Sequence, residues 1–378
     1  MKYLLGIVAV ISGCLYGSKG SSEPLQCNGY SELCNRPYNT VAYAATHNGQ
    51  SHIESDVHNQ DIDVAQQLQS GVRAIKIHVW YNQDEQGNPI PFVCHGIDKE
   101  YLYNAPMEKF FEQVPIFYRP FAKALMEKLE PMKGIVMNAF EAAYGHDNST
   151  GLIPFNHCAL DPARRPLEKL LSDVRSFLDS HPHEVVTLIV EDHTSNLDRI
   201  AADFTSSGLL SYVHIQPLNV PWPTLGQMIK DNKRLVVLLH GAEHLGYTKY
   251  PWMHYIWTYA WDTPWQFKTC TDFKNCTIDV LPHRGKQAFQ DRHKNPQNKI
   301  FIVHHFVTEC MGGSKAGAKK ANKKTVLKSR LERLAKETGH MPNIIQVDFF
   351  QYPNNDIFDV VDELNGVGCY AGKPMCKF

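Results

Sequence analysis

Short apolar runs that alternate with helical patterns constrain the fold of this chain more than any other feature. The runs are rich in β-branched residues and have the length of single strands; they are 40–45, 73–80, 135–140, 185–190, 234–239, 299–303 and 343–349. Apolar residues at helical spacing follow Pro166 and precede Gly366. Strands that alternate with helices predict an α/β fold with a parallel sheet, and seven or eight such units close best into a TIM-type (β/α) barrel.

The predicted barrel is irregular or incomplete, because the runs number fewer than eight. Residues 96–157 are rich in aromatic residues and Met and follow neither pattern, so they are expected to form an insertion. A chain of 378 residues suits two ordinary domains or one enlarged barrel. We predict one catalytic domain over residues 21–378, with the insertion at about 96–157.

Residues 1–20 predict an export signal. Met1 and Lys2 precede the apolar run 3–11, which is too short to span a bilayer. Ile11-Ser12-Gly13-Cys14 resembles a bacterial lipobox that ends at Cys14, whereas residues 17–22 suit ordinary signal peptidase, and both interpretations stay open. We therefore expect a secreted, periplasmic or cell-surface protein, lipid-anchored at Cys14 in the lipobox case.

The cysteines also favour export. Nine remain after Cys14, several at loop-closing spacings, which is typical of an oxidising compartment. The spacings suggest three disulfides, which are Cys27–Cys34, Cys270–Cys276 and Cys369–Cys376. A fourth bond between Cys94 and Cys158 would leave Cys310 unpaired. The alternative is a set of reduced, unconnected thiols.

Charge excludes one class of partner and suggests another. With 38 Lys and Arg against 39 Asp and Glu, the chain has no net field to attract nucleic acid, and none is predicted as a partner. Residues 315–333 hold eight Lys or Arg against the single acid Glu332, with apolar residues at helical spacing. The segment predicts a solvated helix face, or alternatively a surface that contacts anionic lipid head groups of a membrane.

Two histidines follow predicted strands. The first run ends in Thr46-His47-Asn48-Gly49, which places His47 and Asn48 at the carboxyl end of a strand, where a parallel barrel keeps its chemistry. The second run is followed by Phe92-Val93-Cys94-His95-Gly96. His47 and His95 are therefore candidates for an acid–base pair among the 19 histidines of the chain.

Several short motifs in a fixed order resemble the phosphatidylinositol-specific phospholipase C-like phosphodiesterases. In the first part of the chain they are Cys27-Asn28-Gly29, Leu33-Cys34-Asn35-Arg36, Thr46-His47-Asn48, Gly71-Val72-Arg73 and Cys94-His95. The likeness continues over most of the chain through His181-Pro182-His183-Glu184-Val185-Val186, Glu191-Asp192, Trp222-Pro223-Thr224-Leu225-Gly226, Arg234-Leu235-Val236-Val237 and Gln346-Val347-Asp348-Phe349.

The resemblance implies a phosphoric diester hydrolase. In that family the first histidine takes a proton from the inositol 2-hydroxyl, the second protonates the departing glycerol oxygen, and a cyclic phosphate results. His47 and His95 occupy these positions, and Asp348 resembles the carboxylate that orients the first histidine. An imidazole pKa of about 6.5 suits both roles. The substrate is expected to be a phospholipid or another phosphodiester, with its head group left open.

The chain departs from this family on the second strand. Calcium-dependent members carry two acids there, whereas this chain carries Lys76 and His78, on one face by the period of two. Asn48 and Glu191 match the remaining calcium-ligand positions, which is too few for an ion that takes six to eight oxygens. We predict no calcium and no other cofactor: Lys76 pairs with Glu191 and faces the phosphate, and His78 adds a donor. The alternative for Lys76 is a structural ion pair.

Other interpretations stay open. A glycerophosphodiester phosphodiesterase or sphingomyelinase D-like enzyme would need metal-binding acids on the second strand, and a catalytically silent lipid- or glycan-binding barrel would explain the departures. A histidine-bound zinc at His52, His58 or the His304–His305 pair is a further alternative, although the spacing suggests no closed site there. Tyr259, Trp261 and Trp265 are predicted to form an aromatic cluster. The cluster would either contact a ring or acyl chain of the substrate or serve as ordinary packing.

Overall fold

A computed structural model describes residues 24–55, 57–84, 86–96, 158, 161–241, 249–263, 299–309 and 312–372. The predicted export signal, nearly all of the predicted insertion, and the predicted strand 135–140 lie outside these residues. No helix within the described part is long and apolar enough to cross a membrane.

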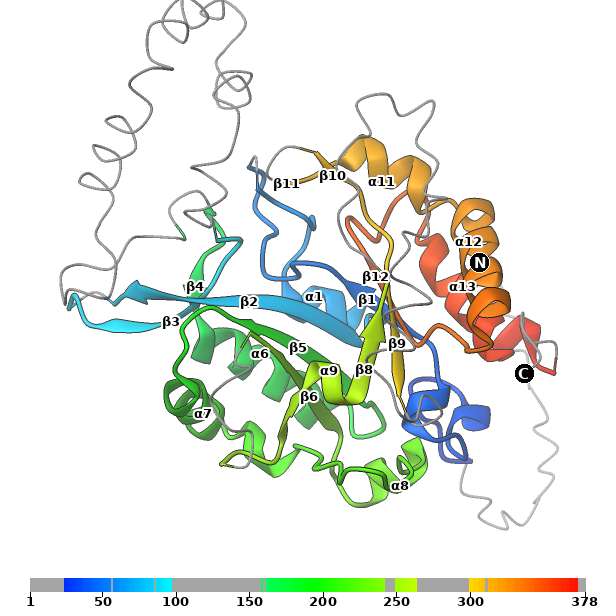
Figure 1. The fold of residues 1–378 in the computed structure, drawn as a ribbon, viewed down its shortest axis with the longest axis horizontal. Coiled ribbons are helices and arrows are strands. Elements are labelled where there is room, and N and C mark those ends of the chain that lie inside the picture. Colours follow the sequence, from blue (N-terminus) through cyan, green and yellow to red (C-terminus); the bar gives the residue numbers. More distant parts are fainter. Residues whose placement is uncertain are drawn as a thin grey trace, which may run out of the picture.

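A curled sheet of parallel strands forms the centre of the molecule (Figure 1). Its order is β7-β6-β5-β2-β1-β12-β9-β8, and each neighbouring pair in this path is parallel. The strands are β1 (Tyr43–Thr46), β2 (Ala74–Gln83), β5 (Val186–Asp192), β6 (Leu235–His240), β7 (Met253–Tyr255), β8 (Ala260–Asp262), β9 (Ile300–His304) and β12 (Ile344–Val347).

The sheet is an incomplete TIM-type barrel. The last strand, β12, pairs with the first, β1, so the strands follow one another around the barrel in chain order. Among the described residues, β7 and β8 do not pair with each other; the short helix α9 (Ile256–Tyr259) links them instead. The predicted α/β barrel is therefore confirmed, and so is its irregularity.

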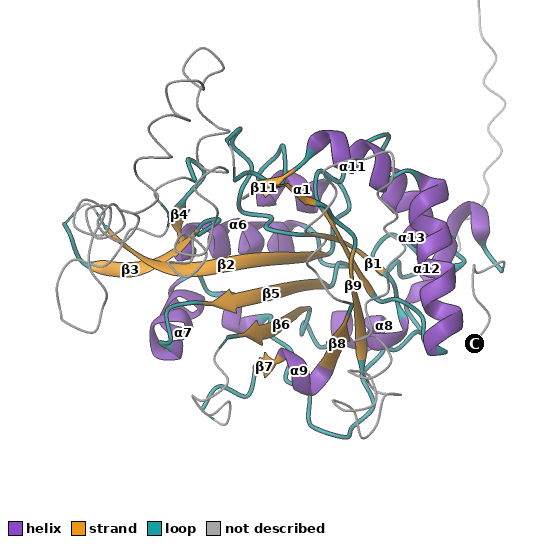
Figure 2. Ribbon diagram, turned by 45° about the horizontal axis from the view of Figure 1, so that its top comes forward, coloured by secondary structure: helices purple, strands orange, loops and turns teal. Residues whose placement is uncertain are grey.

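Helices cover the outer face of the sheet (Figure 2). The two longest described helices, α6 and α12, lie on different sides of the barrel. The helices are α1 (Val64–Gln69), α6 (Leu167–Ser180), α7 (Leu197–Ser206), α8 (Leu225–Lys230), α11 (Lys315–Ala321), α12 (Lys324–Thr338) and α13 (Asp356–Asn365), with 3-10 turns η1 (Ser31–Leu33), η2 (Tyr38–Thr40), η5 (Leu209–Ser211) and η7 (Gly368–Tyr370).

Strand periodicity divides the core into two layers. On β2, Ile75, Ile77 and Val79 point outward into a cluster shared with the helices. Ala74 points inward with apolar residues of the other strands, and Lys76 and His78 follow it on the same face. The interior is therefore apolar toward the amino ends of the strands and polar toward their carboxyl ends, which is where barrel enzymes place their sites.

A hairpin extends β2 beyond the barrel (Figure 1). Strand β3 (Pro89–Val93) pairs antiparallel with β2, and the two-residue strand β4 (Arg165–Pro166) pairs with β3. The amide of Cys94 donates to the carbonyl of His78 at 3.3 Å, so the hairpin returns the chain to the barrel mouth just before His95. A separate pair is formed by β10 (Thr308–Glu309) and β11 (Gly312–Gly313).

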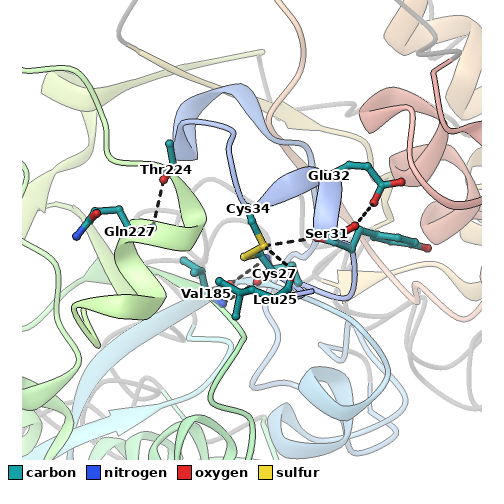
Figure 3. The surroundings of a disulfide bond; sticks show 10 residues. Leu25, Cys27, Ser31, Glu32, Cys34, Val185, Thr224 and Gln227 are labelled. Atoms are coloured by element: carbon teal, nitrogen blue, oxygen red, sulfur yellow. Dashed lines mark hydrogen bonds between the residues drawn. A yellow bond between two sulfur atoms is a disulfide. The ribbon is translucent and has the colours of Figure 1, made fainter. Parts of the chain in front are cut away.

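Two predicted disulfides are present. Cys27–Cys34 closes a small loop that Figure 3 shows beside Val185, at the start of β5, and beside α8. The amide of Val185 donates to Asn28 at 2.7 Å, so this loop is fixed to the amino end of the barrel. Cys94–Cys158 is the second bond. Cys270, Cys276, Cys310 and Cys376 lie outside the described residues, and Cys369 forms no disulfide with another described cysteine.

The basic segment 315–333 forms α11 and most of α12. Several of its cations are paired within the molecule: Lys315 with Asp61, Lys324 with Asp359 and Lys328 with Glu363. Arg330 is buried and donates to the carbonyl of His304 at 2.6 Å. The pairs favour the helix-face interpretation, and contact with anionic lipid stays a prediction.

Candidate active site

His47 and Asp348 meet at the carboxyl ends of the first and last strands. Thr46 of β1 is in register with Val347 of β12, so the next residues lie side by side. His47 Nδ1 is 2.9 Å from Asp348 Oδ1, and the imidazole stacks on Phe306 with 3.7 Å between ring centroids. Since Nδ1 and one ring face are engaged, Nε2 is the nitrogen left for chemistry.

Asn59 connects this dyad to His95. Its amide nitrogen donates to Asp348 Oδ2 at 3.1 Å, and its carbonyl oxygen accepts from His95 Nδ1 at 2.9 Å. The carbonyl of Val57 also accepts from His95 Nδ1, at 2.6 Å. The two nearest partners of that nitrogen are oxygens, and the amide nitrogen of Asn48 is farther away at 3.4 Å. We therefore assign the hydrogen to Nδ1, which leaves His95 Nε2 for chemistry. Sequence reasoning missed Asn59, which lies in the loop after β1.

Asn48 has a left-handed backbone, with φ of 46°, which Asn tolerates better than most residues. Its amide nitrogen donates to Asn59 Oδ1 at 3.1 Å. Its side-chain oxygen is buried and has no hydrogen-bond partner in the described part of the chain. Asn48 therefore offers an acceptor oxygen within the network around His95.

Lys76, His78 and Glu191 form the second half of the site. Lys76 Nζ lies 2.7 Å from Glu191 Oε2, and His78 Nε2 lies 3.5 Å from the same oxygen. The side chains are 15%, 14% and 16% exposed, respectively. His78 is in register with Glu191 on the neighbouring strand β5, so both point into the barrel mouth. All seven predicted site residues thus gather at one end of the barrel, while their roles stay predictions.

Two further histidines contact Glu191, and sequence reasoning missed both. His193 Nε2 is 3.3 Å from Glu191 Oε1, and His240 Nδ1 is 3.4 Å from Oε2. His193 is two residues beyond Glu191, and His240 is opposite Glu191 in the register of β5 and β6. The sequence signal that indicates them is the period of two along adjacent strands, which places alternate residues on the same face.

Burial governs the ionisation of the site. It lowers the pKa of His47 well below 6.5, with a further contribution from the charge of Lys76, and it lowers the pKa of His78 and of His95. Burial also raises the pKa of Asp348 well above 3.8. For Glu191, burial acts against ionisation, but His78 and Lys76 hold its pKa well below 4.5. Lys76 and Glu191 therefore form a fixed ion pair, and burial disfavours the charged form of the three imidazoles.

The remaining candidates divide between the mouth and the core. His304 Nε2 lies 3.1 Å from Asp262 Oδ2 on β8, which places this pair at the mouth. His305 is buried against the carbonyl of Ala321. His52 and His58 contact backbone carbonyls nearby, so the described residues form no zinc site at these histidines.

The predicted aromatic cluster is packing where the structure describes it. Trp261 is 2% exposed and stacks on Phe301 in the outer core layer. The Tyr259 hydroxyl donates to the carbonyl of Gln216 at 2.7 Å. Trp265 lies outside the described residues.

Calcium does not fit this site. Of the four residues at its ligand positions, only Asn48 and Glu191 offer oxygens, and an ammonium group already bonds to the Glu191 carboxylate. What the site holds is a pair of imidazoles oriented through Nδ1, a fixed cation, and neutral donors around them. Such an arrangement supports proton transfer to and from oxygen next to a negatively charged group.

Comparison with known proteins identifies a matching family. The family described as PI-PLC X 1 matches residues 33–119 and 134–365. The chain is 23% identical over 292 residues to PI-PLC X domain-containing protein 1 of Arthroderma benhamiae, covering 75% of this chain and 70% of that protein. A second A. benhamiae relative, named an uncharacterized secreted protein, is 23% identical and covers 96% of this chain and 70% of its own length.

Solved structures were also compared. The phosphatidylinositol-specific phospholipase C of Listeria monocytogenes has a TM-score of 0.46 and 14% identity, covering 89% of this chain and 96% of that chain. A mutant of the Staphylococcus aureus phosphatidylinositol-specific phospholipase C has a TM-score of 0.47 and 13% identity, covering 87% of this chain and 94% of that chain.

Proposed function

The chain belongs to the PI-PLC X family, and from this premise we propose that it is an exported phosphodiesterase. Its proposed substrate is a phosphoinositide-type phospholipid or a related phosphodiester, cleaved by two histidines through a cyclic phosphate. The observation that carries the proposal is a hydrogen-bond network that the two imidazoles share. His47 Nδ1 bonds to Asp348, which accepts from Asn59, and His95 Nδ1 bonds to Asn59 directly.

The proposed reaction transfers two protons. His47 Nε2 takes the proton of a substrate hydroxyl, whose oxygen attacks phosphorus and forms the new P–O bond. The P–O bond to the leaving alcohol breaks, and His95, protonated at Nε2 at the start, gives its proton to the leaving oxygen. The products are a cyclic phosphodiester and a free alcohol, which is diacylglycerol when the substrate is a phospholipid.

Lys76 supplies the positive charge that a phosphoryl transition state requires. Its ammonium group is anchored by Glu191 at 2.7 Å and is only 15% exposed, so its position is fixed before substrate binds. Asn48 and His78 add polar contacts on either side. This arrangement requires no calcium, in keeping with the poor fit of the four residues to that ion.

The test is incubation of the purified protein with a panel of phospholipids, with and without chelator. We expect diacylglycerol and a cyclic phosphate from a phosphoinositide, full activity with chelator, and loss of product in His47→Ala and His95→Ala. Strict dependence on added calcium would contradict the proposed role of Lys76. A folded wild type that cleaves nothing would favour the catalytically silent binding barrel.

Export is the proposed location. Two disulfides in the described residues are typical of an oxidising compartment, and one relative is named a secreted protein. Anchoring at Cys14 is a separate prediction that lies outside the described residues. Mass spectrometry of the mature amino terminus from the native host distinguishes a lipidated Cys14 from cleavage within 17–22.

A further inference from the structure

The carboxylate of Glu191 lies within a cluster of histidines that the proposed reaction does not use in full. We call His78, Glu191 and His193 the Glu191 cluster. Their ligand atoms all lie within 4.8 Å of one another, and no other described group of three His, Cys, Asp or Glu meets this criterion. His240 Nδ1, 3.4 Å from Glu191 Oε2, borders the cluster.

The spacing of the cluster matches the coordination shell of a small metal ion. With metal–ligand bonds of about 2.0–2.1 Å, two ligands of a tetrahedral ion lie about 3.3 Å apart. His193 Nε2 is 3.3 Å from Glu191 Oε1 and 3.3 Å from His78 Nδ1. These separations leave room for an ion after small side-chain rotations that turn the lone pairs toward a common point.

The chemistry of the ligands selects the class of metal. Two imidazoles and one carboxylate suit Zn²⁺ and its neighbours, whereas calcium requires oxygens. His193 is held in place by stacking on Trp80, with 3.8 Å between ring centroids.

We propose that the Glu191 cluster binds a divalent transition metal ion of the Zn²⁺ class, with the neighbouring His240 as the fourth ligand, and that the ion inhibits the enzyme. Inhibition follows because Glu191 has one negative charge and Lys76 Nζ already bonds to its Oε2 at 2.7 Å. A cation bound to Oε1 repels the ammonium group and competes with it for that charge. The inhibitory part rests on the proposed function, whereas the binding part does not.

The binding test uses the metal alone. The protein is dialysed against Zn²⁺ and its metal content is measured, and Co²⁺ is titrated as a probe whose visible absorption reports tetrahedral coordination. We expect one ion per chain. His193→Asn is expected to weaken binding by at least the roughly tenfold to hundredfold that a lost supporting contact typically causes. His183→Asn, an exposed histidine at the other end of β5, is the matched control and keeps full binding.

The activity test separates the two parts of the proposal. Phosphodiesterase activity of the wild type is expected to fall as Zn²⁺ is added and to return with chelator, and the relative fall is expected to disappear in His193→Asn. Absence of bound metal, or binding unchanged in His193→Asn, would overturn the site. A metal-loaded form more active than the metal-free form would overturn the inhibition and the role of Lys76, leaving the site in place. Metal binding without any diester cleavage would refute only the proposed function.

Discussion

Asn59 is the residue that links the two histidines proposed to be catalytic. Its single carboxamide donates to Asp348 and accepts from His95, so it fixes the orientation of both imidazoles at once. It is 1% exposed, and its removal would take a hydrogen-bond partner from the buried Asp348 Oδ2, whereas His95 Nδ1 would keep the carbonyl of Val57. We therefore regard Asn59 as a positioning residue rather than a catalytic one.

Asn59→Ala is expected to lower kcat by about 10-fold to 100-fold, with a much smaller change in KM, because the Lys76–Glu191 ion pair that is proposed to face the phosphate is untouched. The free energy of unfolding is expected to fall by about 1–3 kcal/mol. Steady-state kinetics and a pH profile check this, since a mobile imidazole also shifts the profile. Asn88→Ala, in the exposed turn before β3, is the control; equal effects of the two changes would contradict the positioning role.

The pH profile follows from the burial of the histidines. His47 must be neutral to accept a proton, so activity falls as pH drops through its pKa. His95 must be protonated to give one, so activity falls as pH rises through its pKa. Burial moves both pKa values below 6.5, so the optimum of kcat/KM is expected on the acidic side of 6.5. A profile centred above pH 7 would contradict the assignment.

Lys76 is tested by removing its charge. Lys76→Met is expected to lower kcat by about 10²-fold to 10³-fold, as loss of a group that stabilises transition-state charge does. It also leaves Glu191 buried without its cation, which costs about 3–5 kcal/mol of unfolding free energy. The double variant Lys76→Met, Glu191→Gln is expected to regain most of the stability and none of the activity. Recovery of activity in that variant would assign Lys76 a structural role only.

Residues at strand ends were predictable from the sequence, and residues in loops were not. His47 and Asp348 follow buried strands, and the period of two placed Lys76 and His78 on one face. Asn59 lies far along the loop after β1 rather than directly at a strand end, and nothing in its sequence neighbourhood indicates that this loop contacts both His95 and Asp348. The contacts of His193 and His240 required the register between strands, which no single segment contains.

At the scale of elements, the β2–β3 hairpin positions the proposed general acid. The amide of His95 donates to Asp161 Oδ2 at 2.7 Å, and Cys94, directly before it, is bonded to Cys158. The disulfide and the hydrogen bond thus join the same two segments. Cys27–Cys34, by contrast, lies at the amino end of the barrel, away from the site.

The two disulfides are expected to differ in their effect on catalysis. The double variant Cys94→Ala, Cys158→Ala is expected to lower kcat because the segment that holds His95 loses its anchor. Cys27→Ala, Cys34→Ala is the matched control and is expected to leave kcat nearly unchanged. From sequence separations of 64 and 7, loop-closure entropy predicts losses of about 4 and about 2 kcal/mol of stability. Thermal unfolding and kinetics measure both, and equal kcat values would contradict the role of the first bond.

Element prediction succeeded where a pattern was long enough to repeat. The apolar positions of α6 and α13 are buried as the helical spacing predicts, and α13 ends at Gly366 in the left-handed conformation. Strands β7 and β8 were missed because each has three residues, which is too short to show alternation. They are also the strands between which the barrel is open. Because both are so short, the number of strands predicted from the sequence fell below eight.

At the scale of the whole molecule, the barrel separates stability from function. Apolar side chains fill the interior of the barrel toward the amino ends of the strands and the layer between the sheet and the helices. Polar side chains gather at the carboxyl ends of the strands. This division follows from strand order and pleat alone, which is why the fold could be predicted from the sequence. The head group could not, because specificity lies in segments that connect the strands at the mouth.

The predicted insertion is the segment in which we expect that specificity. The described residues on either side of it are Gly96 and Cys158, and the Cα atoms of Cys94 and Cys158 are 5.5 Å apart, so a short Gly-Ser linker can join the flanking residues. Replacing residues 98–156 in this way is expected to leave a folded barrel that still cleaves a small soluble phosphodiester, because His95 keeps its anchors to Asp161 and Val57. The ratio of rates among phospholipid head groups is expected to change severalfold, measured on mixed vesicles for both proteins. An unchanged ratio would place specificity in the loops that follow the other strands.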